Sequence, residues 1–141
     1  MTRRISLAGQ ATRMLYLAVC AAALVAVPAA AHHSGTMFDD AKTVTLEGVV
    51  KEFQYTNPHS WLLVDVTGAD GKVVTWGFEA EGPTTLMMMQ VRRSDFAPGT
   101  KVTISGHPMK DGRPAAAWVK GVRADGKEFF PRGRAAAETK Y

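Results

Sequence analysis

Four histidines are the side chains of this 141-residue chain most suited to chemistry: His32, His33, His59 and His107. Imidazole is the commonest transition-metal ligand in proteins and suits copper and zinc. His32 and His33 are adjacent and follow an apolar segment. His59 follows an Asn-Pro turn, and His107 lies in a stretch bounded by glycines, so we expect both in loops. Whether the four converge depends on the fold.

Residues 1–31 have the features of a secretory signal peptide. Basic residues precede a 14-residue apolar core, Met14–Val27, and small residues follow it up to Ala31. The core is shorter than the ~20 residues of a membrane span, so we expect cleavage after Ala30 or Ala31 and a periplasmic or secreted product without a membrane span. A retained anchor and a lipoprotein acylated on Cys20 are the alternatives.

Either cleavage creates a metal-binding end. Cleavage after Ala31 makes His32 the first residue, whose amine and imidazole can chelate one ion. Cleavage after Ala30 gives Ala-His-His, whose amine, amide and imidazole nitrogens fit the square plane of Cu(II). The alternative is a flexible histidine end with incidental affinity.

The mature chain is nearly neutral and contains no cysteine. Arg3, Arg4 and Arg13 leave with the signal, which leaves 14 basic and 13 acidic residues, a net charge of +1. This balance gives no support for nucleic-acid binding. The loss of Cys20 removes both a disulfide and a cysteine nucleophile.

The strand pattern predicts five strands and one short helix. Residues 43–55 form a long strand, and we expect a bulge or bend at Gly48, where the inward set shifts from Val44 and Leu46 to Val49, Phe53 and Tyr55. Further strands are expected at 61–67, 72–80, 101–105 and 115–122, with a short extension near 128–130. A helix that begins at Pro83 and reaches Val91 separates the third and fourth strands.

This order predicts an all-β fold with one short helix, an OB-fold-like five-stranded Greek-key barrel. An open two-layer sandwich is the alternative. We therefore expect a signal peptide (1–31), an N-terminal arm (32–42) anchored by Met37 and Phe38, a barrel (43–130) and a flexible tail (131–141).

The barrel would place the candidate ligands at one rim. The loop with His59 and the loop with His107 and Met109 flank the usual ligand face of OB-folds. The arm of about eleven residues spans up to roughly 35 Å and can carry His32 and His33 there. The alternative is that the loop histidines are exposed turn residues, or that His59 packs against Trp61.

Other residues are expected to be structural. Met87, Met88 and Met89 point about 100° apart on a helix and cannot all hold one ion, so we interpret them as core filler. Glu79 and Glu81 share a strand face, which we interpret as a solvated edge. Catalytic motifs such as a nucleophile elbow are absent from the sequence, and we expect no enzyme.

Several segments together resemble one known family. They are the Ala-His-His-Ser start, Phe38-Asp39, the Val-Thr-Leu-Glu-Gly run, Thr56-Asn57-Pro58-His59, Trp76 with Glu79, and the late Asp-Gly turns. They resemble a family of small exported bacterial proteins known only as a domain of unknown function. The resemblance covers roughly residues 31–130 and implies a periplasmic single domain, but no activity.

Two functions are compatible with these features. The first is a periplasmic module that binds a transition metal, in particular Cu(II), through His32, His33, His59, His107 and Met109. The second is a metal-free module that binds an envelope protein or a small ligand on the barrel face through Trp61, Tyr55 and Asn57. The sequence leaves the metal, the partner and the oligomeric state open.

Overall fold

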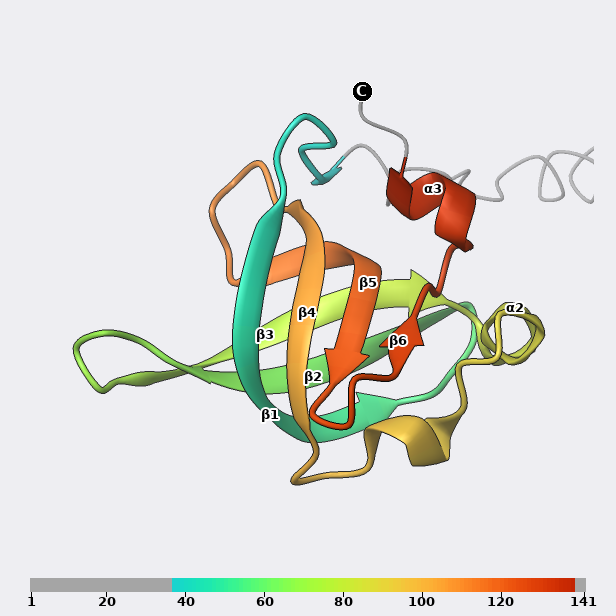
Figure 1. Cartoon of the computed structure of the whole chain (residues 1–141). Helices are drawn as coiled ribbons and strands as arrows, with labels where there is room; N and C mark the ends of the chain where they lie inside the picture. The colour runs from blue at the N-terminus through green and yellow to red at the C-terminus, as the bar shows by residue number, and fades with distance from the viewer. Residues whose placement is uncertain (1–36, 139–141) are drawn as a thin grey trace, which may run out of the picture. The chain divides into compact units, whose positions relative to one another are not determined.

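A computed structural model describes residues 37–138 of the chain as a β-barrel with short helices (Figure 1). The order is three strands, two short helical segments, three strands and a last helix. The elements are β1 Val44–Gln54, β2 His59–Thr67, β3 Val73–Glu81, α2 Pro83–Met88, the 3-10 helix η3 Arg93–Phe96, β4 Lys101–Pro108, β5 Ala115–Arg123, β6 Glu128–Phe129 and α3 Arg134–Glu138.

Five strands close into the predicted OB-like barrel. The order is β3-β2-β1-β4-β5, and a parallel pairing of β3 with β5 closes the ring, with Phe78 opposite Ala116. β6 adds a short edge to β5. The far end of the β2–β3 hairpin extends beyond the barrel as a twisted ribbon (Figure 1). Because the barrel is closed, few strand edges are left with unpaired backbone N–H and C=O groups.

β1 is long because it serves two partners. It pairs with β4 up to Val49 and with β2 from Val49 onward. Gly48 allows this change of partner, because a Cβ there would lie 2.5 Å from the Asp65 carbonyl oxygen. The predicted phase change at Gly48 was wrong in position: the bulge lies between Val50 and Glu52, so Val50 is buried and Val49 is exposed.

Aromatic rings fill the barrel around Trp118. Phe53 and Phe96 contact it edge to face, at centroid distances of 5.9 and 4.9 Å. Such rings bury large apolar areas and account for much of the hydrophobic stabilisation of a small core. Gly121 lies against the indole ring, where a Cβ would meet Trp118 at 3.0 Å. Trp76 packs at the margin of this core and is only partly buried.

α2 is shorter than predicted. It ends at Met88, and Gln90 adopts φ 59°, with hydrogen bonds from Gln90 N–H to the Met87 carbonyl and from Val91 N–H to the Leu86 carbonyl. These bonds form a Schellman C-cap. Leu86 is the buried residue of the helix, whereas the expectation that the three methionines fill the core was wrong: Met87, Met88 and Met89 are exposed.

The end of the N-terminal arm is fastened to the β4–β5 hairpin. Phe38 forms a bridge with Met109, supported by hydrogen bonds from Asp39 N–H to the Pro108 carbonyl and from Lys110 N–H to the Met37 carbonyl. Phe38 is 2% exposed, whereas Met37, the other expected anchor, is 40% exposed. We call these contacts the arm clasp.

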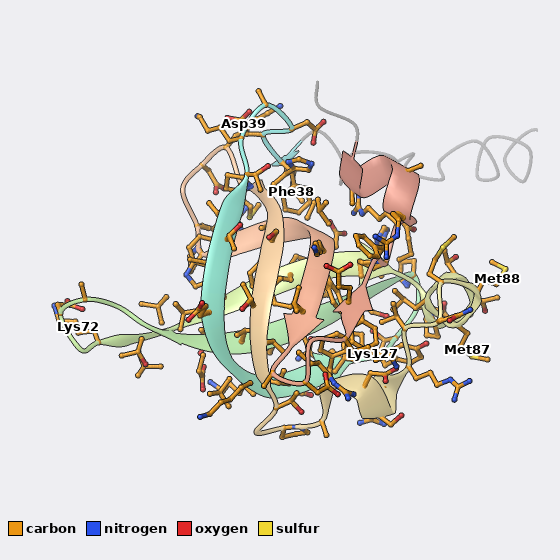
Figure 2. The ribbon with its side chains drawn as sticks, viewed as in Figure 1. Phe38, Asp39, Lys72, Met87, Met88 and Lys127 are labelled. Atoms are coloured by element: carbon orange, nitrogen blue, oxygen red, sulfur yellow. The ribbon has the colours of Figure 1, made fainter. Side chains whose placement is uncertain are left out.

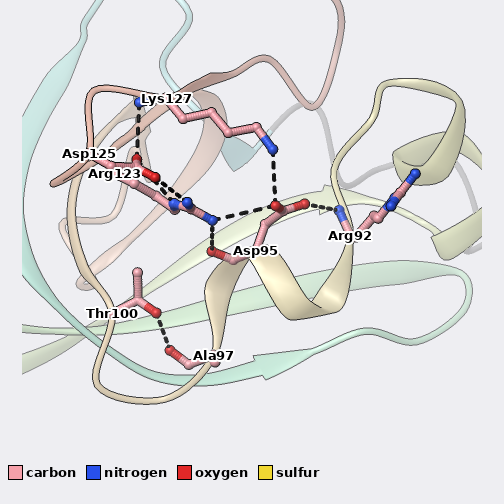
Figure 3. A network of polar contacts seen from close by, with 7 residues as sticks. All are labelled: Arg92, Asp95, Ala97, Thr100, Arg123, Asp125 and Lys127. Atoms are coloured by element: carbon pink, nitrogen blue, oxygen red, sulfur yellow. Dashed lines mark hydrogen bonds and ion pairs between the residues drawn. The ribbon is translucent and has the colours of Figure 1, made fainter.

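A charged network joins η3 to the β5–β6 turn (Figure 3). The Asp95 carboxylate accepts the Arg92 backbone N–H at 2.9 Å and pairs with Lys127 at 3.2 Å and Arg123 at 3.5 Å. Arg123 also pairs with Asp125. Beyond it, the segment expected to be a flexible tail includes the buried Pro131 and α3.

Candidate functional site

The most distinctive polar contact on the barrel joins the first residue of β2 to a residue near the end of β3. His59 Nδ1 lies 3.2 Å from Glu79 Oε1. His59 was expected in a loop, but it already pairs with Glu81 in the β2–β3 ladder. A strand position holds the imidazole more firmly than a loop would.

Glu79 is buried on the outer side of the barrel. Its side chain is 5% exposed, so the expectation of a solvated edge was wrong. The reason is the closure of the barrel: β3 is paired on both sides, and Glu79 lies between Trp61 of β2 and Ala117 of β5. Burial raises the pKa of the Glu79 carboxyl group, while the charges of His59 and Arg132 oppose the shift.

The imidazole of His59 presents one nitrogen to Glu79 and its other edge outward. Nδ1 is buried and has no aligned hydrogen bond within the described residues, although 32% of the side chain is exposed. The exposed part of the side chain therefore lies away from Nδ1. A histidine whose Nδ1 faces a carboxylate and whose Nε2 is accessible has the arrangement of a metal-ligating histidine.

Trp61 forms an aromatic wall beside this pair. It is opposite Glu79 in the ladder, and its ring covers Gly77, where a Cβ would lie 3.1 Å from the indole. Trp61 is half-buried. Because directly paired residues point to the same side of a sheet, His59, Trp61 and Glu79 share one outer surface, which we call the Glu79 face.

The arm clasp borders the Glu79 face. Phe38 packs with Met109 against Ala117, which is the β5 partner of Glu79. His33 precedes Phe38 by five residues, a span of up to about 17 Å, and neighbouring strands lie about 4.8 Å apart. His32 and His33 lie outside the described residues, as does the expected signal peptide. The clasp therefore fixes the described end of the arm beside the β5 partner of Glu79.

His107 and Met109 are placed differently from the prediction. β4 continues to Pro108, so His107 lies on a strand and not in a loop. Its Nδ1 lies 2.7 Å from the Lys42 carbonyl oxygen. A carbonyl can only accept, so Nδ1 donates and Nε2 carries no proton in the neutral ring. Met109 is buried beneath Phe38.

Tyr55 and Asn57, predicted to contact a ligand, lie at the β1–β2 turn. The Tyr55 hydroxyl lies within hydrogen-bond distance of the Pro83 and Val91 carbonyl oxygens, so it fastens α2 to the barrel. Asn57 is exposed beside Gly82, where a Cβ would lie 2.8 Å from the Asn57 side-chain oxygen. Asn57 remains accessible, whereas Tyr55 is engaged in the fold.

The described residues do not form a complete metal site by themselves. Between residues 37 and 138 there is no group of three or more His, Cys, Asp or Glu side chains placed to hold an ion. The same part of the chain has no helix with the length and apolar character needed to cross a membrane.

Comparison with protein families gave a match over most of the chain, whereas comparison with individual proteins gave none. A model described as "Family of unknown function (DUF6152)" matches residues 19–117, which include β1 to β4, the arm and the start of β5. The search of curated proteins and the search of solved structures found no significant match.

Proposed function

The chain belongs to a family of unknown function, DUF6152, and we propose that this protein is an exported module that binds Cu(II). The observation that carries the proposal is the His59–Glu79 pair beside the clasped arm. Nitrogen ligands and a terminal amine favour Cu(II) over harder ions. The proposed role is to sequester or deliver the ion, without catalysis.

Each residue has a distinct role in this proposal. His59 binds the ion through Nε2, and the Glu79 carboxylate, 3.2 Å from Nδ1, fixes the orientation of the ring. His32 and His33 supply further imidazole nitrogens, and the new N-terminus, Ala31 or His32, supplies the amine. Carboxylate partners of this kind typically change metal affinity by about 10–100-fold when they are removed.

Two predicted ligands receive other roles. We assign Met109 to packing, because its thioether lies under Phe38. His107 holds the arm through Lys42, and its Nε2 is a secondary candidate ligand. A metal held by His59 and the arm does not require either residue.

Calorimetric titration of the mature protein with Cu(II), in the presence of a weak competing chelator, tests this proposal. We expect one tight ion per chain, and we expect His59→Ala to weaken binding by at least tenfold. Met109→Leu, which preserves volume, is the matched control and should bind normally. Equal binding by wild-type and His59→Ala protein would refute the proposed site.

The second candidate function is metal-free binding on the Glu79 face. The observation that favours it is Trp61, a half-buried ring on the outer surface of β2. Tryptophan is a frequent anchor in protein interfaces. Under this hypothesis Trp61→Ala abolishes capture of an envelope partner, whereas His59→Ala leaves it unchanged.

A further inference from the structure

The end of α2 exposes apolar side chains that the barrel does not use. Met87 is 65% exposed and Met88 is 68% exposed, whereas their neighbour Leu86 is fully buried. Figure 2 shows both methionines at the outermost edge of the barrel, pointing outward. Most exposed side chains of a small domain are polar, so neighbouring exposed methionines indicate a contact surface.

Two arginines follow these methionines. Arg92 and Arg93 are exposed, and the described part of the chain contains no ion pair for either guanidinium. The Arg92 backbone N–H is held by Asp95, which fixes where the side chain starts. Figure 3 shows the Arg92 side chain extending away from the Asp95 carboxylate.

The acidic residues near these arginines have other partners. Glu52, which lines the same hollow as Arg93, accepts a hydrogen bond from the Gln54 side chain. Asp95 is directed toward Arg123 and Lys127. The helix itself contributes no acidic residue to its first turn. Residues 83–93 therefore combine protruding apolar side chains with two cations and no carboxylate.

We propose that the α2 tip, defined as Met87, Met88, Arg92 and Arg93, docks on an anionic lipid surface. The methionines would enter the boundary between headgroups and acyl chains, and the guanidinium groups would bind lipid phosphates. Charge complementarity favours an anionic surface over a neutral one. Shape favours a membrane over a protein partner, because the apolar side chains protrude and a protein partner would need a matching cavity.

Sedimentation of the mature protein with phosphatidylcholine vesicles, with and without phosphatidylglycerol, tests the proposal. We expect binding only to vesicles that contain phosphatidylglycerol, and we expect added salt to weaken it. Replacing both Met87 and Met88 with Gln should reduce binding at least tenfold. Arg92→Gln together with Arg93→Gln should reduce it by about fivefold per charge, in line with the contribution of juxtamembrane cations.

Matched controls separate the α2 tip from general stickiness. Val73 is 61% exposed on the β2–β3 hairpin, so Val73→Thr removes a comparable apolar group elsewhere and should bind normally. Lys72→Gln with Lys101→Gln removes the same net charge and should bind better than the arginine variant. Unchanged thermal midpoints confirm that all variants fold.

Three results would overturn the proposal. The first is wild-type binding that is equal on vesicles with and without phosphatidylglycerol, or absent from both. The second is full binding by the double methionine variant. The third is a concentration-dependent dimer, seen by sedimentation equilibrium, that the methionine substitutions abolish, since a second copy would then be the occupant.

Discussion

His59 Nδ1 lies 3.2 Å from Oε1 of Glu79, a carboxylate whose side chain is almost fully buried. The two residues come from adjacent strands of a closed barrel, so their spacing is set by the sheet and not by a loop. Buried carboxylates are costly to the fold unless they are paired. The effect of this pair on the free energy of unfolding and its effect on metal affinity can be measured separately.

Replacing Glu79 with Gln should affect stability and metal binding in opposite directions. Burial raises the pKa of Glu79 above its ordinary 4.5, so its ionised form is disfavoured in the folded state. Glu79→Gln should therefore stabilise the metal-free protein at neutral pH by on the order of 1 kcal/mol, and should weaken Cu(II) binding about tenfold or more.

The pH dependence follows from the same shift. Because the pKa of Glu79 is raised in the folded state, the protonated carboxyl group favours the fold at pH values below its ordinary pKa of 4.5. This contribution is lost as the pH rises through the pKa of Glu79 in the folded protein. The gain from Glu79→Gln should thus appear at neutral pH and vanish in acid. Thermal unfolding across pH measures it, with Glu81→Gln as the control. A gain that persists at pH values below the ordinary carboxyl pKa would contradict the burial argument.

Loosening the arm clasp should weaken metal binding without removing any ligand. Phe38→Ala removes the packing of Phe38 against Met109 and Ala117. The loss of a buried phenylalanine side chain typically lowers the free energy of unfolding by about 3 kcal/mol. We expect lower Cu(II) affinity, because the arm then loses more conformational entropy when it reaches His59. Phe129→Ala, a buried phenylalanine of β6, is the control and should lower stability but not affinity. Equal affinities for both variants would exclude a role for the clasp.

Cu(II) should quench the fluorescence of Trp61. This indole is opposite Glu79 in the ladder, whereas Trp118 lies in the core. Emission should fall on adding stoichiometric Cu(II), and the fall should be much smaller in Trp61→Phe. Quenching should also decline in acid, because imidazole must be neutral to bind metal. Quenching that persists unchanged in Trp61→Phe would place the ion elsewhere.

The Asp95 network should matter for stability and not for metal. Asp95→Ala removes the partner of the Arg92 N–H and of two cations, and we expect a loss of about 1–3 kcal/mol. Asp125→Ala removes a more exposed carboxylate from the same arginine and should have a smaller effect, as is usual for surface ion pairs. Chemical denaturation measures both. A larger loss for Asp125→Ala would contradict the network described.

The sequence predicted the barrel better than the site. Alternating apolar residues and the turn residues between them indicate where strands lie along the chain. The five predicted strands and the position of the helix are confirmed. The bulge was misplaced because Gly48 marks a close backbone approach and not a phase change. Sequence alone does not show which strand closes the barrel, so the burial of Glu79 was missed. One sequence signal was available. Gly77, Glu79 and Glu81 alternate with the apolar Phe78, which indicates that Glu79 lies on the outer side of β3.

The methionines illustrate a second limit. A helix of six residues buries one side chain, Leu86, and the periodicity of so short a segment does not identify which. Loop positions for His59 and His107 were inferred from nearby proline and glycine, but both residues lie on strands. Strand ends are fixed by pairing partners distant in sequence, which local turn signals do not reveal.

Native mass spectrometry of the mature protein with Cu(II) tests the central claim most directly. It measures the N-terminal cleavage site and the metal stoichiometry in one spectrum. We expect a chain that begins at Ala31 or His32, one retained copper in the wild type, and loss of that copper in His59→Ala but not in Met109→Leu. A copper retained equally by His59→Ala would show that the His59–Glu79 pair does not hold the metal.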